Sequence, residues 1–289
     1  MMVFDYLQQT PAAFLAAVGV LGLLMGSFLN VVILRLPRML EREWRSQCQE
    51  LLGASAPVPD QHFDLLWPPS ACPHCQRRIR PWENIPLLSY LLLRGRCRGC
   101  GGRISLRYPL IEALTAVLSV YVAWHFGFGA QALTALALTW GLIALSVIDL
   151  DHQLLPDNLT LPLLWLGLLL SLGEVFVDPR ASIIGAVAGY LSLWLVYHGF
   201  RLLTGKEGMG YGDFKLLAML GAWLGWQALP VIILLSSLVG ALVGIAMILL
   251  LGRDRNIPIP FGPYLAAAGW LALLWGDRLT DAYLRMTGL

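Results

Sequence analysis

Charged residues are scarce in this 289-residue chain, at 13%, whereas an ordinary soluble domain carries about 25%. Apolar residues make up 57% and form long runs, several of which approach the roughly 20 residues needed to cross a bilayer. A large soluble helical bundle would need polar faces on its outer helices, and these are nearly absent. The scarcity of charge therefore argues against a soluble protein and predicts an all-α, polytopic protein embedded in the lipid bilayer.

The chain also lacks the basic segment with which a secretory signal peptide begins. Residues 1–11 contain one acidic residue, Asp5, and no Lys or Arg, so we expect no cleavable signal. The apolar run 12–34 should then remain as the first membrane helix. The net charge of only +2 also gives no basic footprint, so we expect no nucleic-acid partner.

Run length and the Gly and Pro breaks predict about eight transmembrane helices. The two weakest are 159–177, which contains Glu174, and 214–227, which is short. A short span is compatible with a helix bundle or a water-filled cavity, where lipid does not set its length. The eight predicted spans are 12–34, 109–126, 130–149, 159–177, 181–203, 214–227, 230–251 and 259–276.

The basic residues predict the orientation. Seventeen of the 20 Lys and Arg residues fall in segments on one side of the predicted bundle, and by the positive-inside rule that side is cytoplasmic. Only Arg180, Arg278 and Arg285 fall opposite. The predicted domains are a first transmembrane helix (1–34), a small cytoplasmic insert (35–108) and a membrane-embedded region (109–289). We expect 41–52 of the insert to be a short charged helix and 54–69 to be irregular.

Cysteine is rare, and four of the five form two CxxC pairs in the insert, separated by 21 residues. Two such pairs are typical of a tetrahedral zinc site that stabilises a small domain. A reducing cytoplasm argues against two disulfides, and thiolates select soft metals. Metal-free thiols and a redox-active pair remain alternatives; Cys48 is left over, and His74 is interpreted as a spacer. The predicted Zn²⁺ ligands are Cys72, Cys75, Cys97 and Cys100.

Common catalytic motifs are missing: there is no HExxH, no Walker loop, no GxGxxG and no recognisable Ser or His nucleophile signature. What remains is a set of carboxylates at membrane depth, where ionisable groups are costly and each is a functional hypothesis. These carboxylates are Glu112, Asp149, Asp151, Asp157 and Asp213.

Asp149 and Asp213 stand out from this set. Asp149 ends an uninterrupted apolar run, and Asp213 follows two glycines that would give another backbone close access to it. An N-cap role is the alternative interpretation for Asp213 and the favoured one for Asp157. Glu112 is interpreted as an ordinary acidic residue in the first turn of a helix that begins at a proline. Two carboxylates held together share one proton, so that one activates water and the other protonates the scissile carbonyl.

With these residues the sequence resembles the bacterial type IV prepilin peptidases, which are bifunctional leader peptidase/N-methyltransferases of the GxGD aspartyl protease class. The resemblance covers essentially the whole chain, although Gln76 stands where many members have Gly. The motifs that carry it, besides the two CxxC pairs, are Gly26-Ser-Phe-Leu-Asn-Val-Val, Asn84-Ile-Pro-Leu, Asp149-Leu-Asp-His-Gln-Leu-Leu-Pro156, Gly208-Met-Gly-Tyr-Gly-Asp213-Phe-Lys215 and Pro260-Phe-Gly-Pro263-Tyr.

The resemblance implies that Asp149 and Asp213 are catalytic. It implies as substrates the prepilins and the pseudopilins of type II secretion, whose basic leader is cut on the cytoplasmic side. It further implies methylation of the new N-terminal residue from S-adenosylmethionine, and we expect that cofactor near the insert and residues 26–30. A helix dipole at Asp213 would favour this carboxylate as the base. A membrane transporter and a non-catalytic assembly factor of a pilus or secretion machine are the alternative functions.

Overall fold

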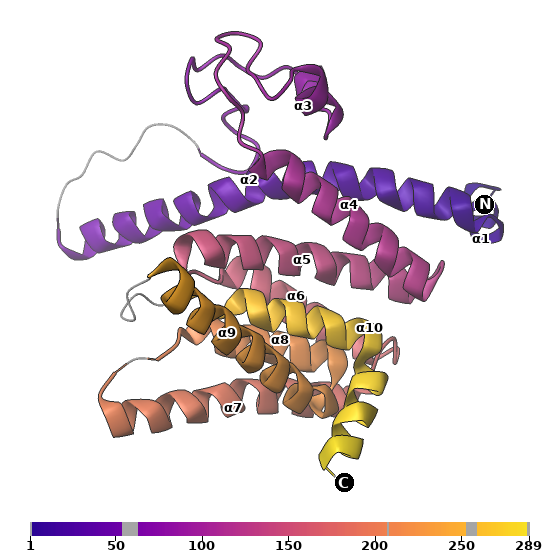
Figure 1. Ribbon diagram of the computed structural model, residues 1–289, viewed down its shortest axis with the longest axis vertical. Coiled ribbons are helices and arrows are strands. Elements are labelled where there is room, and N and C mark those ends of the chain that lie inside the picture. The colour runs from indigo at the N-terminus through magenta and orange to yellow at the C-terminus, as the bar shows by residue number, and fades with distance from the viewer. Residues whose placement is uncertain (1, 54–62, 207, 253–258, 288–289) are drawn as a thin grey trace. The chain divides into compact units, whose positions relative to one another are not determined.

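The computed structural model describes residues 2–53, 63–206, 208–252 and 259–287, and it is helical throughout these ranges apart from loops and two isolated β-bridges (Figure 1). The all-α prediction is therefore confirmed. Part of the stretch predicted to be irregular (54–62) lies outside the described residues. So do Arg253 and Arg255, two of the 17 basic residues that predict the cytoplasmic side. The chain divides into two compact units, Met1–Phe128 and Gly129–Leu289, and each is described by itself.

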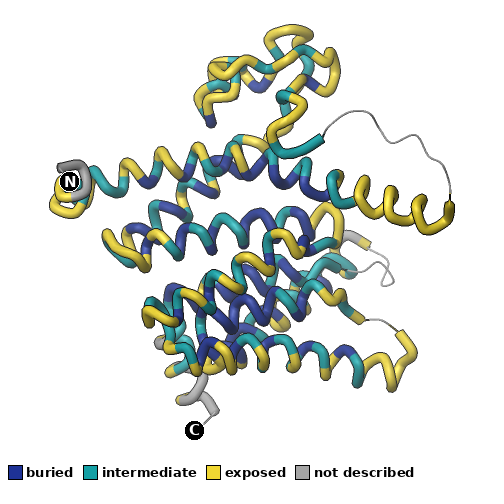
Figure 2. The backbone as a smooth tube through the Cα atoms, turned by 180° about the vertical axis from the view of Figure 1, so that it is seen from behind, coloured by how far each residue is buried: buried dark blue, intermediate teal, exposed yellow. Residues whose placement is uncertain are grey.

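The first unit is built on one long helix. Helix α2 begins with Pro11 in its first turn, where proline costs no hydrogen bond, and it does not end at residue 34. It continues past Pro37, carried by strong helix formers such as Met, Leu, Glu and Arg. Residues 41–51 are thus helical, as predicted, but they extend α2 and do not form a short helix of their own. The exposed residues 41–51 form the outer end of α2 (Figure 2). The helices of this unit are α1 (Met2–Gln9), α2 (Pro11–Leu51), η1 (Pro81–Asn84), α3 (Leu88–Leu92) and α4 (Arg107–Phe126).

Small residues bring α2 and α4 into close contact. A Cβ on Gly22 would lie 2.8 Å from the Cα of Ala116, and one on Gly26 would lie 2.6 Å from the Cα of Glu112. Asn30, one turn further, is buried and donates hydrogen bonds to the carbonyls of Gly26 (3.2 Å) and Tyr108 (3.1 Å). Close approach and a buried amide are how helices associate in lipid, where water does not drive packing. The 26–32 motif is thus a packing seam.

The second unit is a bundle around α8. This helix packs against α6, α7 and α10, while α10 also contacts α5 and α9. Glycines of α7 meet the α8 backbone directly: a Cβ on Gly189 would lie 2.6 Å from the carbonyl oxygen of Leu217. Ten of the 14 residues of α8 are buried. The helices of this unit are α5 (Ala130–His152), α6 (Asp157–Ser171), α7 (Pro179–Thr204), α8 (Tyr211–Leu224), η2 (Trp226–Ala228), α9 (Leu229–Leu251) and α10 (Gly262–Thr287).

Five helices within the described residues are long and apolar enough to cross a membrane, which supports a multi-pass membrane protein. They correspond to α2, α4, α5, α7 and the run Trp226–Leu250. Helix α6 is shorter than predicted: it ends at Ser171, and Glu174 lies beyond it with a φ of +49°. Helix α8 is only about 21 Å long at 1.5 Å per residue. Because protein encloses α8, packing and not lipid thickness sets its length.

Candidate active site and metal centre

Asp149 lies in the last turn of α5 and is buried, with 5% of its surface exposed. Its Oδ2 accepts a hydrogen bond from the backbone N–H of Gly262, the first residue of α10, at 2.9 Å. The first N–H groups of a helix have no partner inside the helix. Asp149 therefore accepts a hydrogen bond from one of these unpaired N–H groups. Its carboxylate also lies at the positive end of the α10 dipole, which stabilises a negative charge.

Asp213 is the third residue of α8 and is equally buried, at 6% exposed. The helix begins after Gly210, so Asp213 lies in the first turn and is not the N-cap residue. Its own N–H bonds to the Gly210 carbonyl at 3.2 Å. Tyr211 and Phe214 on either side pack against Tyr197 of α7 with ring centroids 5.3 and 5.6 Å away. Aromatic packing on α7 thus holds the turn that carries the carboxylate.

The fold brings the two aspartates together although they are far apart in the sequence. The charge of Asp149 acts on Asp213, and Leu155 links their surroundings. A Cβ on Gly212 would lie 2.8 Å from the Leu155 Cβ, and a Cβ on Gly262 would lie 3.1 Å from the Leu155 Cδ2. Two buried carboxylates at adjoining helix ends can share a proton and act as acid and base.

The other two aspartates of the set lie outside this buried pair. Asp157 does not cap α6: Pro156 occupies the cap position, and Asp157, as first helical residue, binds the Lys215 Nζ through both oxygens at 2.7 and 2.8 Å. The capping prediction is wrong because an ion pair with a residue 58 positions away fixes the side chain instead. Asp151 is exposed.

Glu112 does not lie in the first turn of a helix, where the sequence predicted it. Helix α4 begins at Arg107, two residues before the proline, so Glu112 is the sixth helical residue and lies beyond the first turn. It is buried, and its Oε2 accepts a hydrogen bond from the backbone N–H of Leu87 at 2.9 Å.

The role of Gly262 as a donor to Asp149 was not predicted from the sequence. The signal that could have pointed to it is the Pro260-Phe-Gly-Pro263 motif.

The four predicted cysteine ligands converge in the first unit. Their Sγ atoms all lie within 4.8 Å of one another, and the group does not include His74, as predicted. The Sγ atoms of Cys72 and Cys100 are 3.9 Å apart. A tetrahedron with Zn–S bonds of about 2.3 Å has S···S edges of about 3.8 Å, so the cluster fits a metal ion of zinc's size. All five cysteines are free in this structure.

Two matching turns build this centre. In the first, the N–H of Gln76 bonds to the Cys72 carbonyl at 2.9 Å, and in the second the N–H of Gly101 bonds to the Cys97 carbonyl at 2.9 Å. The residue after each second cysteine is left-handed, with φ of +57° at Gln76 and +70° at Gly101. Backbone hydrogen bonds from Cys75 and then His74 lower the pKa of the Cys72 thiol to about 6. Despite a backbone hydrogen bond from Gly102, burial and the hydrogen bonds with the other three thiols raise the pKa of Cys100 to about 11, so Cys72 is the thiol most ready to bind a metal as thiolate.

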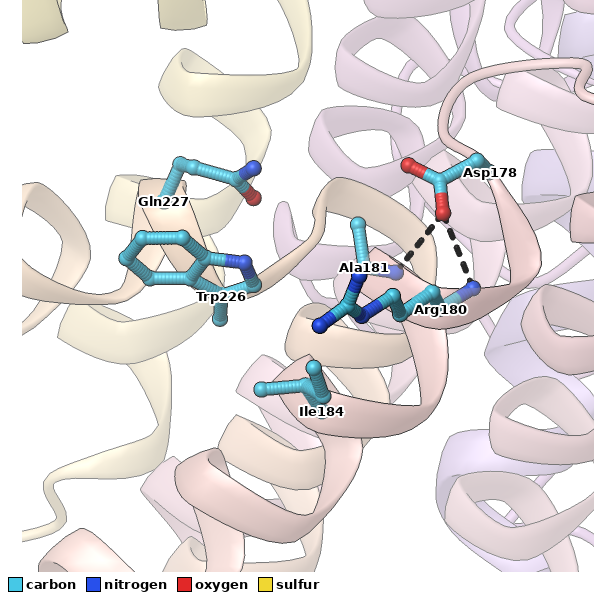
Figure 3. Close-up of a pocket in the computed structure, with 6 residues that line it drawn as sticks. All are labelled: Asp178, Arg180, Ala181, Ile184, Trp226 and Gln227. Atoms are coloured by element: carbon cyan, nitrogen blue, oxygen red, sulfur yellow. Dashed lines mark hydrogen bonds between the residues drawn. The ribbon is translucent and has the colours of Figure 1, made fainter.

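A cofactor site is harder to place. The α4 backbone packs directly against Gly26, so this face of α2 is not open to a ligand. In the second unit a hollow of about 550 Å³ lies at the start of α7 and η2 (Figure 3). There the Asp178 Oδ1 caps α7 by accepting the N–H groups of Arg180 and Ala181. Neither catalytic candidate contributes to this hollow, which is lined by Asp178, Arg180, Ala181, Ile184, Trp226 and Gln227.

Comparison with known proteins identifies the family. Residues 20–126 match the family described as Bacterial Peptidase A24 N-terminal domain, and residues 136–245 match the Type IV leader peptidase family. Relatives named Prepilin leader peptidase/N-methyltransferase include one from Pseudomonas aeruginosa, 59% identical over 288 residues, which covers 100% of this chain and 99% of the relative.

A second such relative, from Aeromonas hydrophila, is 60% identical over 275 residues, covering 95% of each chain. A third, from Legionella pneumophila, is 49% identical over 267 residues and covers 92% of this chain and 93% of the relative. No solved structure matches the chain significantly. The full-length similarity and the two family matches agree with the motifs of the dyad and of the cysteine cluster, and the chain therefore belongs to the family of prepilin leader peptidases/N-methyltransferases.

Proposed function

We propose that this protein cleaves the leader of type IV prepilins and then methylates the new N-terminal residue, with Asp149 and Asp213 as the catalytic dyad. The observation that carries the proposal is the burial of both carboxylates at adjoining helix ends, with the N–H of Gly262 on Asp149. The names of the relatives support the two activities. Pseudopilins of type II secretion are a second substrate class, supported by the resemblance alone.

In the proposed cleavage step the dyad holds one proton between two carboxylates. The ionised member accepts a proton from water as the water attacks the scissile carbonyl, and the other donates its proton to the carbonyl oxygen. The helix dipole does not assign these roles, because α8 offers its N-terminus to Asp213 and α10 offers its own to Asp149. The dipole at Asp213 therefore does not favour this carboxylate over Asp149 as the base.

We further propose that the dyad opens to the cytoplasm and that the protein resides in the bacterial inner membrane. The distribution of Lys and Arg supports this orientation, since both aspartates border segments rich in basic residues. A prepilin inserted by its own apolar helix would present its basic leader on that side. The predicted regions 1–34, 35–108 and 109–289 stay a prediction; packing groups α4 with the first unit.

Zinc is the metal that we propose for the four cysteines, because thiolates in a tetrahedral arrangement select it over harder cations. Its role would be to hold the insert folded. S-adenosylmethionine would supply the methyl group; the insert is its proposed location, and no residue is assigned to it.

The dyad is tested by following leader removal from a prepilin in membranes that contain wild type, Asp149→Asn or Asp213→Asn. Both variants should lose cleavage, because each removes one proton-transfer group while keeping the side-chain shape. Asp151→Asn is the matched control, since it alters an exposed aspartate two residues from Asp149, and it should retain activity. Cleavage that survives in either dyad variant would refute the assignment.

The same assay separates the alternatives. A transporter or an assembly factor would leave the prepilin uncut even in the wild type. For the metal, purified protein should contain about one zinc per chain, and Cys72→Ser or Cys97→Ser should lose it. Freshly purified wild type without stoichiometric metal would contradict the zinc assignment. Cysteine variants that still cleave but no longer methylate would show that the insert serves the second activity.

A further inference from the structure

The insert carries an exposed apolar strip over η1 and α3. Its members are large side chains that are between 44% and 82% exposed. Three of them, in α3, are spaced i, i+3 and i+4, so they share one face of the helix. Soluble domains normally expose apolar side chains singly, so a contiguous exposed apolar patch marks a surface that contacts a partner or a membrane. The strip consists of Trp82, Ile85, Leu88, Leu91 and Leu92.

A hydrogen bond fixes the depth of this strip relative to a membrane helix. The N–H of Leu87, the residue just before α3, donates to the Oε2 of Glu112 in α4 at 2.9 Å. Helix α4 has 20 residues, which is about the length needed to cross a hydrocarbon core roughly 30 Å thick. Glu112 lies five residues after Arg107, about 8 Å along the helix axis. The start of α3 is therefore level with the first turns of a membrane span.

The bond also explains an otherwise costly carboxylate. An irregular peptide at membrane depth needs a protein partner for its N–H, because lipid offers none. Leu87 is such a peptide, with φ of +58° and ψ of −49°. Glu112 is buried at 8% exposed and also bonds to the Ser27 side chain. Glu112 is thus buried because it anchors Leu87, and with it the start of α3, against α4.

Basic residues border the strip. The Arg80 guanidinium lies 5.4 Å from the centre of the Trp82 ring, and Arg94 and Arg96 follow α3 directly and are exposed. Tyr108, one residue into α4 from Arg107, is 37% exposed. Aromatic rings and arginines beside leucines are the composition of a segment at the boundary between headgroups and acyl chains, and the arginines match the phosphates of anionic lipids.

We propose that α3 is an interfacial membrane helix: the strip inserts into the same bilayer that α4 crosses, and the neighbouring arginines contact anionic lipid headgroups. The occupant of the apolar face is thus phospholipid. The proposal rests on the multi-pass membrane character of the chain and on contacts within the first unit. It does not depend on the peptidase activity, so a failed cleavage assay leaves it standing.

The test places a photoreactive p-benzoylphenylalanine at Leu91 in the full chain, reconstituted in bilayers of phosphatidylethanolamine and phosphatidylglycerol. After irradiation, mass spectrometry should detect lipid adducts at this position. The control position is Gln76, an exposed residue of the first cysteine turn, where lipid adducts should be at background. Equal adduct yields at the two positions, or adducts only to protein at Leu91, would overturn the proposal, and adducts to an added prepilin would identify a substrate surface instead.

Two variants test the anchor separately. Glu112→Leu removes the acceptor for the Leu87 N–H and should abolish most of the lipid adduct at Leu91, whereas Glu112→Gln keeps an acceptor oxygen and should retain it. The metal content of the cysteine cluster reports whether the insert is still folded in each variant. Replacing phosphatidylglycerol with phosphatidylcholine should lower the adduct yield, because the arginines then lose their anionic partners. Yields that are equal in the two Glu112 variants, both with metal bound, would refute the anchor.

Discussion

Replacing Gly262 with alanine should disable leader cleavage without unfolding the protein. The new Cβ would lie 2.7 Å from the Oδ2 of Asp149, closer than real Cβ atoms approach a neighbour, and 3.1 Å from the Cδ2 of Leu155, which is a tight contact. The φ of Gly262 is not in the left-handed region, so alanine adds no backbone strain and the contact alone decides the outcome. Asp149 must move, and the 2.9 Å hydrogen bond from the Gly262 N–H must lengthen or break.

The magnitude follows from that hydrogen bond. A bond to a charged group contributes about 1.5–3 kcal/mol, which corresponds to a loss of about 10- to 150-fold in rate. Displacing a catalytic group by about 1 Å costs on the order of 100-fold by itself. We therefore expect kcat/KM for leader cleavage to fall by about 100-fold. The thermal unfolding midpoint should fall by only several degrees, because a shift of the Asp149 side chain at the end of α5 relieves the contact.

The assay is cleavage of a prepilin by purified protein in detergent, with the unfolding midpoint measured on the same samples. Gly276→Ala is the matched control, since it makes the same substitution later in α10, just past the kink at Trp275, where a Cβ meets nothing within 4 Å. It should cleave like the wild type. A Gly262→Ala protein that is folded and fully active would refute the view that this glycine gives Asp149 its space and its hydrogen bond.

Three further predictions concern packing, an ion pair and a turn. Gly189→Ala in α7 should destabilise the bundle by about 1–3 kcal/mol in detergent unfolding, because its Cβ would lie 2.6 Å from a carbonyl oxygen of α8. Gly199→Ala in the same helix is the control: its Cβ would contact nothing within 4 Å, so the free energy of unfolding should not change. Asp157→Asn should lower the free energy of unfolding by about 0–1 kcal/mol and reduce cleavage only slightly, because its ion pair with Lys215 is solvent-exposed. The effect should be smaller at high salt, and a large, salt-independent loss would contradict this. Gln76→Gly should make the metal harder to remove with a chelator by relieving about 1 kcal/mol of left-handed strain, and easier removal would refute the argument.

The sequence was sufficient where the determinants of a feature are local. Each CxxC pair contains the thiols and the turn that positions them, so the convergence of the four thiols could be predicted from their spacing alone. The long apolar runs likewise predicted most helices, because each run must satisfy its backbone internally in lipid.

The failures came from contacts between residues far apart in the chain. Asp157 was assigned to a helix cap because its neighbours favour capping, but Lys215, 58 residues later, binds it instead. Glu112 was read as ordinary first-turn chemistry, because nothing near it shows that Leu87 needs an acceptor. Gly262 donates to a carboxylate 113 residues earlier. Each of these pairings depends on how helices pack, which a single sequence does not specify.

The length of α2 has a mechanical consequence. At 1.5 Å per residue its 41 residues extend about 60 Å, roughly twice the hydrocarbon thickness. Its outer half holds the start of the insert: Arg35 donates to the carbonyls of Asp64 and Pro68 at 3.0 and 2.6 Å, and the Arg42 guanidinium lies 4.1 Å from the centre of the Phe63 ring. Any rotation or sliding of α2 within the bilayer must therefore carry these insert residues with it, so the helical register of α2 sets the direction in which this part of the insert faces.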